Sequence, residues 1–294
     1  MAVVGTLLSL LVFFALFGVF LTQYVPVWMS ENESTWAGQI QASMAQLQSN
    51  IEQQVVLGAP SVYATPFVMD SQGIPLFATS TQGILTFGAA VLNSVNASPY
   101  ATYTPSVAYN LTGYNGVSYL AHSFPTGFVE MNLPNRYYVP QTYQLEDDAV
   151  IQAQSPSSQF VEFPPLLKVT SAGANLTVLL EIVQFGGNST QSYFQGTQDL
   201  YTTYSNSQSV SFNSTTSYGL TISTYTHYPC AWWNMFNNTI RQNKLEGVAS
   251  SSNSAGYCVS SAGALTKVSL RLTGVTSFTY LLGEISISTG VGVA

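Results

Sequence analysis

The chain has 294 residues, which is enough for one or two cored domains beside a long helix. Only 6% of the residues are charged, the formal net charge is −7, and the sequence contains no basic run. This balance argues against nucleic acid as a partner. After Met29 no second uncharged apolar stretch approaches the length of a membrane span, which argues against a multi-span membrane protein.

An uncharged apolar segment opens the sequence. Residues 2–21 are nearly all Ala, Val, Leu, Phe or Gly, and the first charged residue is Glu31. One helix of this kind can cross a bilayer, because it satisfies its backbone polar groups internally. Within the segment we assign Leu7, Leu11 and Phe14 to packing between helices.

The next segment is rich in amides but keeps a helical period. Its apolar residues recur at steps of three or four and predict one stripe of a helix: Trp36, Ile40, Met44, Leu47, Ile51 and Val55. A helix over residues 2–57 would be about 80 Å long at ~1.5 Å per residue, more than a bilayer needs. The stripe must therefore be covered by the head of the same chain or by copies of the chain. We favour copies, because the polar face has almost no charge and tolerates close packing.

Three signals predict how this helical region is divided. Pro26 leaves a backbone hydrogen bond unmade and should kink or divide the helix. Ser30 lies three residues before Glu33, a capping-box spacing that predicts the start of a second helix. Gly58, with a proline two residues later, predicts the end of that helix. Residues 1–58 are thus predicted to form the apolar and amphipathic helix.

From residue 59 onward short β-type runs alternate with turn residues. Residues 176–185 are apolar on both faces, which predicts a central strand covered on two sides. Cleaner alternation predicts further strands at 210–212, 220–222, 268–273 and 285–288, with loops at 213–215 and 218–219. The predicted fold class is α+β: a long N-terminal helix followed by a mainly antiparallel β-sandwich-like head at 59–294. Residues 152–159 are the best candidate for a boundary between two subdomains of the head.

Asn-X-Ser/Thr sequons are spread over the region that follows the apolar segment. Six of them are acceptable glycosylation acceptors: Asn32, Asn110, Asn175, Asn188, Asn213 and Asn237. Together they predict N-linked glycans and an extracellular location for most of the chain.

The two cysteines, Cys230 and Cys258, fit the same compartment. An even count in an extracellular chain predicts a disulfide. Closing a loop of this size would stabilise the fold by ~3 kcal/mol in the chain-entropy description. His227 lies three residues before Cys230 and raises a catalytic alternative. We disfavour that alternative, because no acidic partner or activating environment can be inferred.

Other candidate chemistry is sparse. The sequence has no nucleotide-binding loop, nucleophile elbow, haem attachment motif or metal-ligand spacing, so we expect no enzyme activity, cofactor or metal. The acidic cluster at residues 146–148 matches no calcium loop and is interpreted as a solvated loop.

Clustered aromatic residues leave one binding alternative open. Arg136-Tyr137-Tyr138 with Tyr143, and Trp232-Trp233, could form a surface that stacks on carbohydrate. Sheet packing or subunit contact is the favoured interpretation, because these residue types are common in both.

At its N-terminal end the chain resembles the type IV pilin-like subunits of archaeal surface filaments. The resemblance lies in the uncharged segment that begins Ala2-Val3-Val4-Gly5-Thr6 and runs into an amide-rich helix and a sequon-rich β-head. Gly5 and Thr6 stand where bacterial pilins carry a glutamate, which favours the archaeal group. The resemblance implies removal of a short basic leader, followed by packing of the helix with copies of itself in a filament core.

These observations lead to one expected function and one alternative. We expect a structural subunit of an extracellular filament, membrane-inserted before assembly, whose partners are copies of itself and N-linked glycans. On that expectation Leu47→Asp or Ile51→Asp would block assembly and leave the head folded. The alternative is a single-pass cell-surface protein whose head binds glycans or a surface layer.

Overall fold

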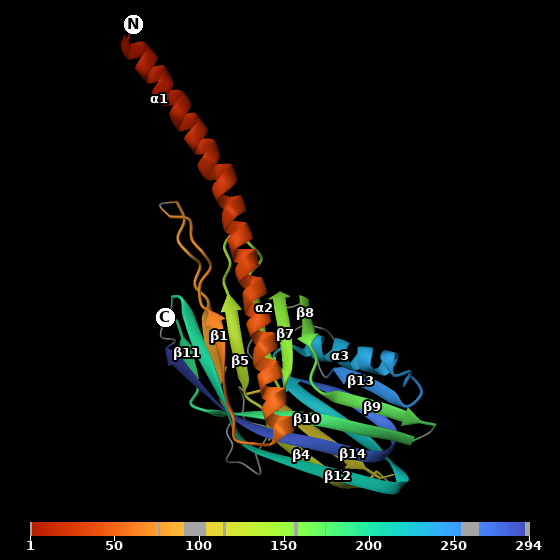
Figure 1. The fold of residues 1–294 in the computed structure, drawn as a ribbon. Coiled ribbons are helices and arrows are strands. Elements are labelled where there is room, and N and C mark those ends of the chain that lie inside the picture. The colour runs from red at the N-terminus through yellow and green to blue at the C-terminus, as the bar shows by residue number, and fades with distance from the viewer. Residues whose placement is uncertain are drawn as a thin grey trace.

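The computed structural model describes residues 2–75, 77–90, 104–113, 116–155, 158–173, 175–193, 195–253 and 265–291. One continuous helix occupies the N-terminal end in three parts: α1 (Ala2–Val19), a π-helical turn η1 (Phe20–Tyr24) and α2 (Val25–Leu57). α1 projects beyond the head, whereas α2 lies along it (Figure 1).

The kink predicted at Pro26 is confirmed, whereas the predicted start of a second helix at Ser30 is wrong, because α2 already begins at Val25 and runs through Ser30. Pro26 lacks an N–H and its ring crowds the carbonyl four residues earlier. The π turn just before it absorbs this misfit, and the Val25 N–H bonds the Phe20 carbonyl across the wider turn. The helix bends there (Figure 1). The predicted end is confirmed, since Gly58 is a left-handed cap whose N–H donates to Gln54 O.

Two sheets form the head, which confirms the predicted α+β class. The larger has the order β4-β3-β12-β14-β10-β9, with β1 on β12 and β13 on β14. Its strands are β1 (Val62–Val68), β3 (Ser106–Thr112), β4 (Ser118–Pro125), β9 (Leu167–Ala172), β10 (Asn175–Gly187), β12 (Thr197–Thr226), β13 (Ala249–Asn253) and β14 (Thr266–Val291). Among the described strands the pairs are antiparallel except β10 with β14.

The smaller sheet has the order β11-β2-β5-β6-β7-β8. Its strands are β2 (Ile84–Gly88), β5 (Phe128–Leu133), β6 (Gln141–Glu146), β7 (Ala149–Ser155), β8 (Ser158–Phe163) and β11 (Thr190–Ser192). The described residues of the candidate subdomain boundary, 152–155 and 158–159, lie in the paired strands β7 and β8. The candidate boundary therefore falls between neighbouring strands of one sheet.

The long strands β12 and β14 pair along most of their length. The runs predicted at 210–212 and 220–222 are parts of β12, and those at 268–273 and 285–288 are parts of β14. The loops predicted at 213–215 and 218–219 are instead an irregularity within β12, where the register with β14 shifts between Asn213 and Tyr218. An unpaired bulge interrupts a ladder without ending the strand.

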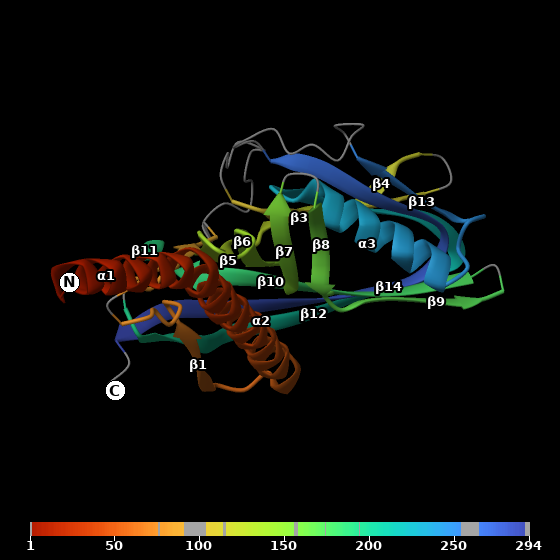
Figure 2. The same ribbon diagram turned by 90° about the horizontal axis from the view of Figure 1, so that it is seen from above.

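Two core clusters occupy different parts of the head. The α2 cluster comprises the predicted helix stripe with Phe67, Met69, Leu85, Phe87, Val129, Met131, Leu133, Tyr143, Leu145, Val150, Val183, Phe185, Leu200, Ile285 and Ile287. The α3 cluster is built around the helix α3 (Pro229–Gln242), with Trp232 and Phe236 packed on residues of the large sheet. Figure 2 shows α2 and α3 over separate regions of the strands.

β10 confirms the prediction of a strand covered on both faces. Val178, Leu180 and Ile182 face the α3 cluster, whereas Val183 and Phe185 face the α2 cluster. β10 lies between β14 and β9 in the sheet, so it is also paired on both edges.

Candidate assembly and membrane interface

The α1 helix exposes its apolar side chains. Leu7, Leu11 and Phe14, the residues assigned to packing between helices, are 62%, 67% and 59% exposed. Residues 3–57 form a helix that is long and, in its N-terminal part, apolar enough to cross a membrane, and that apolar part is not buried against the head. An exposed apolar surface of this extent marks a site of contact with lipid or protein.

An aromatic row follows α1 toward the head. Phe13 stacks on Phe17 at 5.9 Å between ring centroids, and Phe20 contacts Tyr24 at 6.1 Å and Trp28 at 5.7 Å. Tyr24 and Trp28 are exposed just before the first charged residue of the chain. Amphipathic rings at such a transition are typical of a membrane–water boundary.

The stripe on α2 packs against the head of its own chain. All six residues are buried in the α2 cluster: Trp36, Ile40, Met44, Leu47, Ile51 and Val55. The interpretation of the stripe as a contact between copies is therefore wrong, and the other alternative holds. For the same reason the head's core includes residues from both sides of the predicted boundary at residue 58.

Polar side chains fasten the same helix to the head. Gln48 Nε2 donates to Asp148 O at 2.7 Å, and Gln54 Nε2 donates to Thr202 O at 3.0 Å. Trp36 Nε1 donates to Val68 O at 2.7 Å. The amides that suggested packing among copies thus satisfy buried backbone carbonyls of the head, as buried polar groups require.

Glu33 is a buried carboxylate with a different role from the predicted helix cap. Oε2 accepts the N–H groups of Tyr137 and Tyr138 at 2.8 and 2.7 Å, and Oε1 accepts the N–H of Arg136 and the hydroxyl of Thr81. Burial alone would raise the pKa of Glu33, but these hydrogen bonds outweigh it and lower the pKa. The carboxylate therefore holds two loops of the head against α2.

The acidic cluster is not the predicted solvated loop, because Glu146, Asp147 and Asp148 are buried. Asp147 and Asp148 have φ values of 47° and 59°, as in the tight turn that links paired strands β6 and β7. Glu146 accepts hydrogen bonds from Gln144, Thr226 and Trp232. Thr226 and Trp232 are distant in sequence, so their contacts with Glu146 give the sequence no local signal.

The buried carboxyl groups have raised pKa values. Burial, opposed by hydrogen bonds, raises the pKa of Glu146 to about 7. Burial also raises the pKa of Glu181 to about 7, with a contribution from the nearby charge of Glu52. Within the described part of the chain, neither oxygen of Asp148 and neither of Glu181 has a hydrogen-bond partner. Burial and the charge of Glu181 raise the pKa of Asp148.

The sequons differ in exposure. Asn175, Asn188 and Asn213 are exposed, whereas Asn32, Asn110 and Asn237 are half-buried. Each of the half-buried three makes a side-chain hydrogen bond: Asn32 Nδ2 donates to Gln72 O, Asn110 Oδ1 accepts from Ser118, and Asn237 Oδ1 accepts from Ser251. The bond of Asn32 uses the nitrogen to which a glycan would be attached.

The predicted disulfide stays a prediction. Cys230 is buried in α3, and Cys258 lies outside the described residues.

The aromatic residues considered for carbohydrate stacking do not share one surface, because Tyr143 is buried in the α2 cluster and Trp232 in the α3 cluster. Tyr137 and Trp233 remain partly exposed.

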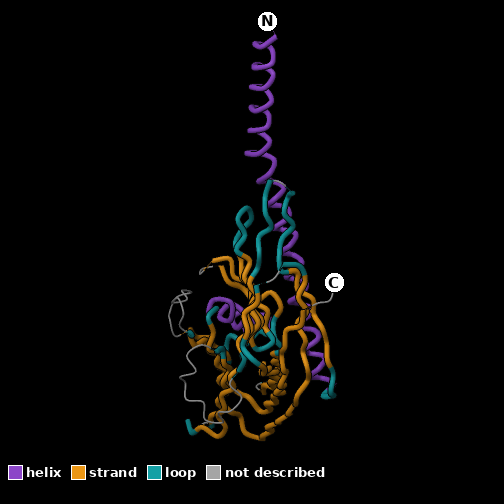
Figure 3. Tube along the Cα trace, turned by 90° about the vertical axis from the view of Figure 1, so that its left-hand side faces the viewer, coloured by secondary structure: helices purple, strands orange, loops and turns teal. Residues whose placement is uncertain are grey.

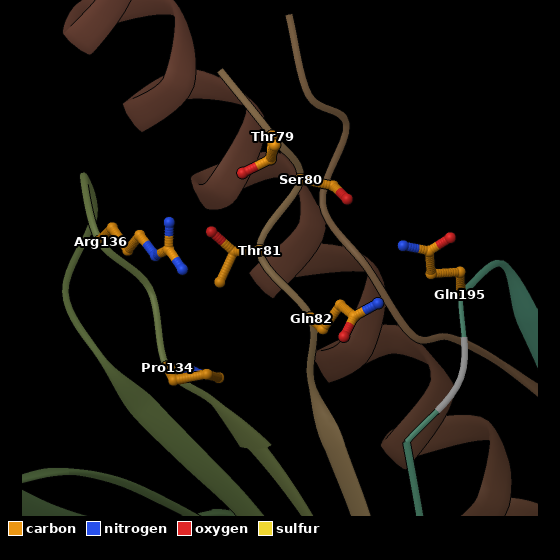
Figure 4. Close-up of a pocket in the computed structure, with 7 residues that line it drawn as sticks. All are labelled: Thr79, Ser80, Thr81, Gln82, Pro134, Arg136 and Gln195. Atoms are coloured by element: carbon orange, nitrogen blue, oxygen red, sulfur yellow. The ribbon is translucent and has the colours of Figure 1, made fainter.

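A polar hollow of about 430 Å³ lies between the loops that Glu33 holds. Its lining residues are Thr79, Ser80, Thr81, Gln82, Pro134, Arg136 and Gln195 (Figure 4). One guanidinium with several hydroxyl and amide groups suits an anionic or neutral polar group. These residues include no pair of nucleophile and base, and the described ranges contain no group of three or more His, Cys, Asp or Glu placed to hold a metal.

Comparisons with family models, with curated proteins and with solved structures found no match to this chain. The surface of α1 is therefore the feature on which a function can be argued. The location of this surface was predictable from composition. The hydrogen-bonding role of Glu33 and the burial of the acidic turn were not.

Proposed function

We propose that the chain is a structural subunit of an extracellular type IV pilus-like filament that polymerises through α1. Before assembly α1 lies in the membrane, and after assembly it forms the filament core with copies of itself. The β-rich head stays outside, where it carries the exposed sequons. The resemblance of the N-terminal segment to archaeal pilin-like subunits supports this proposal.

The observation that carries the proposal is a helix whose large apolar side chains are left mostly uncovered by the described part of its own chain. The large side chains of α1 that are exposed are Val3, Val4, Leu7, Leu8, Leu10, Leu11, Val12, Phe13, Phe14, Leu16, Phe17 and Val19. Relative to exposure in water, burying each of them is worth about 1.5–3 kcal/mol, on the order of 20 kcal/mol per subunit, so α1 must be covered by lipid before assembly and by helix copies after it. These side chains lie on every side of the helix, which suits packing against several neighbouring helices at once.

A second candidate function is a single-pass membrane anchor with an extracellular head. The specific observation in its favour is that the α2 stripe is already used by the head, which leaves α1 for the remaining contacts. Its 18 residues span about 27 Å at ~1.5 Å per residue, close to the thickness of a hydrocarbon core. In this case α1 stays in lipid and the head binds a glycan or a surface layer.

Electron microscopy of material sheared from producing cells, with peptide mass spectrometry, tests the proposal. We expect regular filaments rich in this chain. Leu11→Asp should abolish them, because a charge would be buried in the core, while the exposed Ser171→Asp should not. Recovery of the chain only as discrete, detergent-soluble membrane particles would favour the anchor, and normal filaments from Leu11→Asp would contradict assembly through α1.

A further inference from the structure

A narrow two-armed ribbon, described at residues 70–75 and 77–82, rises from the head beside the helix. It follows β1 and precedes β2, and it is visible as the orange loop above β1 in Figure 1 and among the loops beside the helix in Figure 3. The arms are joined by the backbone bond from Ser71 N to Thr81 O at 2.9 Å. At Gly73 an added Cβ would lie 2.8 Å from Ala78 O, so the arms lie too close for a side chain there.

The base of the ribbon is fixed to α2. Asn32 Nδ2 donates to Gln72 O at 3.0 Å, and Thr81 Oγ1 donates to Glu33 Oε1 at 2.6 Å. One bond comes from each arm of the ribbon. The ribbon is therefore held in a defined direction along the helix.

The tip of the ribbon contacts the apolar part of the helix. The ring of Phe77 lies 5.5 Å from that of Phe20 and 6.3 Å from that of Phe17. At ~1.5 Å per residue, Phe20 is about 6 Å beyond Tyr24 and about 16 Å beyond Glu31, the first charged residue. The tip thus reaches a level at which the helix is uncharged and exposed.

The chemistry of the tip suits lipid. Residues 74–78 have the apolar sequence Ile-Pro-Leu-Phe-Ala, and Phe77 is 41% exposed. Ile74 and Ala78 exchange backbone hydrogen bonds of 2.9 and 3.0 Å, and the Phe77 N–H donates to Ile74 O. Pro75 has no N–H to satisfy. A backbone that enters lipid must pair its polar groups internally, and these bonds pair both backbone groups of Ile74 and of Ala78 and the N–H of Phe77.

We propose that the ribbon is a second membrane-docking element, which places its tip in the outer leaflet of the bilayer beside α1. The polar arms, which carry Ser71, Gln72, Thr79 and Ser80, then lie toward the headgroups. This inference rests on the membrane-inserted stage of the proposed function. Two insertion points at different positions fix the depth and the rotation of the head on the membrane, which a single helix does not.

Spin labels on the full-length chain, reconstituted as one molecule per lipid nanodisc, test the proposal. Labels are placed by Phe77→Cys and Pro75→Cys at the tip, by Leu11→Cys as the lipid reference and by Ser171→Cys as the water reference. Pro75 and Ser171 are exposed, so labelling there leaves the fold intact. The unsubstituted chain, carried through the same labelling, gives the background from its two cysteines.

We expect both tip labels to behave like Leu11→Cys. Their collisions with a water-soluble nickel chelate should be several-fold rarer than at Ser171→Cys, and their collisions with oxygen more frequent. Tip labels that match Ser171→Cys while Leu11→Cys reports lipid would overturn the ribbon proposal and leave the filament proposal standing. Tip protection that appears only with several chains per disc would assign the tip to a contact between copies and would also overturn it. Water exposure at Leu11→Cys would instead contradict the membrane-inserted stage itself.

Discussion

The two halves of the N-terminal helix meet different environments although they form one continuous rod. α1 is apolar on every side and exposed, whereas α2 is amphipathic and buries its stripe in the head. The difference follows from the sequence pattern. A stripe on one face fits a single surface, such as the head's core, while an all-round apolar helix needs lipid or several neighbours. Of these two halves, only α1 is therefore available for assembly or membrane insertion.

Substitutions of matched leucines in α1 and α2 should show the largest difference in stability between the two halves of the helix. Leu47→Ala should destabilise the head by about 3 kcal/mol, because it opens a cavity in the α2 cluster. Leu11→Ala should leave the free energy of unfolding of the head unchanged, because that side chain is exposed. Denaturant unfolding in detergent, followed by the fluorescence of the buried tryptophans, checks both values.

The burial of the stripe also corrects the expectation that an aspartate there would leave the head folded. Leu47→Asp and Ile51→Asp add a buried charge to the cavity and should unfold the head. A folded head in either variant would mean that the stripe does not belong to the core.

Removing the charge of Glu33 is expected to have the next largest effect. Glu33→Gln weakens the acceptor of four hydrogen bonds from Thr81 and residues 136–138. Hydrogen bonds to a charged group contribute about 1.5–3 kcal/mol each. We therefore expect the free energy of unfolding to fall by about 2 kcal/mol in total. Hydrogen exchange at residues 136–138 should rise with it. Glu31→Gln, an exposed change on the same helix, is the control and should alter neither quantity.

The stability of the head should depend on pH, because two of its buried carboxyl groups have raised pKa values, whereas Glu33 on α2 has a lowered one. Glu146 and Glu181 have pKa values of about 7 in the folded chain against an ordinary value of 4.5, so folding favours their protonated forms. Their contribution is fully present below pH 4.5 and is lost as the pH rises through 7. Glu33 has a lowered pKa and acts oppositely, since its contribution is lost only as the pH falls through that lowered value.

Thermal unfolding from pH 4 to pH 8 measures this effect. We expect the melting temperature to fall as the pH rises, and Glu181→Gln to flatten the dependence. Glu246→Gln, an exposed change, should leave the dependence intact. A melting temperature that rises from pH 4 to pH 8 would contradict the raised pKa values of the buried Glu146 and Glu181.

Much of the fold could be predicted from local pattern. The helical stripe, the Gly58 cap and the two-faced strand at 176–185 each depend on residues close in sequence, and all three lie where predicted. The partner of the stripe could not be predicted, because an amphipathic face fits a head and a copy equally well. The burial of Glu146 was equally hidden, since its donors Thr226 and Trp232 are about eighty residues away.

A reconstruction of the sheared filaments by electron cryo-microscopy would show what covers each half of the helix. We expect α1 helices packed on one another along the filament axis, with Trp36, Leu47 and Ile51 of each subunit facing that subunit's own head. A filament in which this stripe faces a neighbouring subunit, or in which α1 has no contact with other copies, would contradict this expectation.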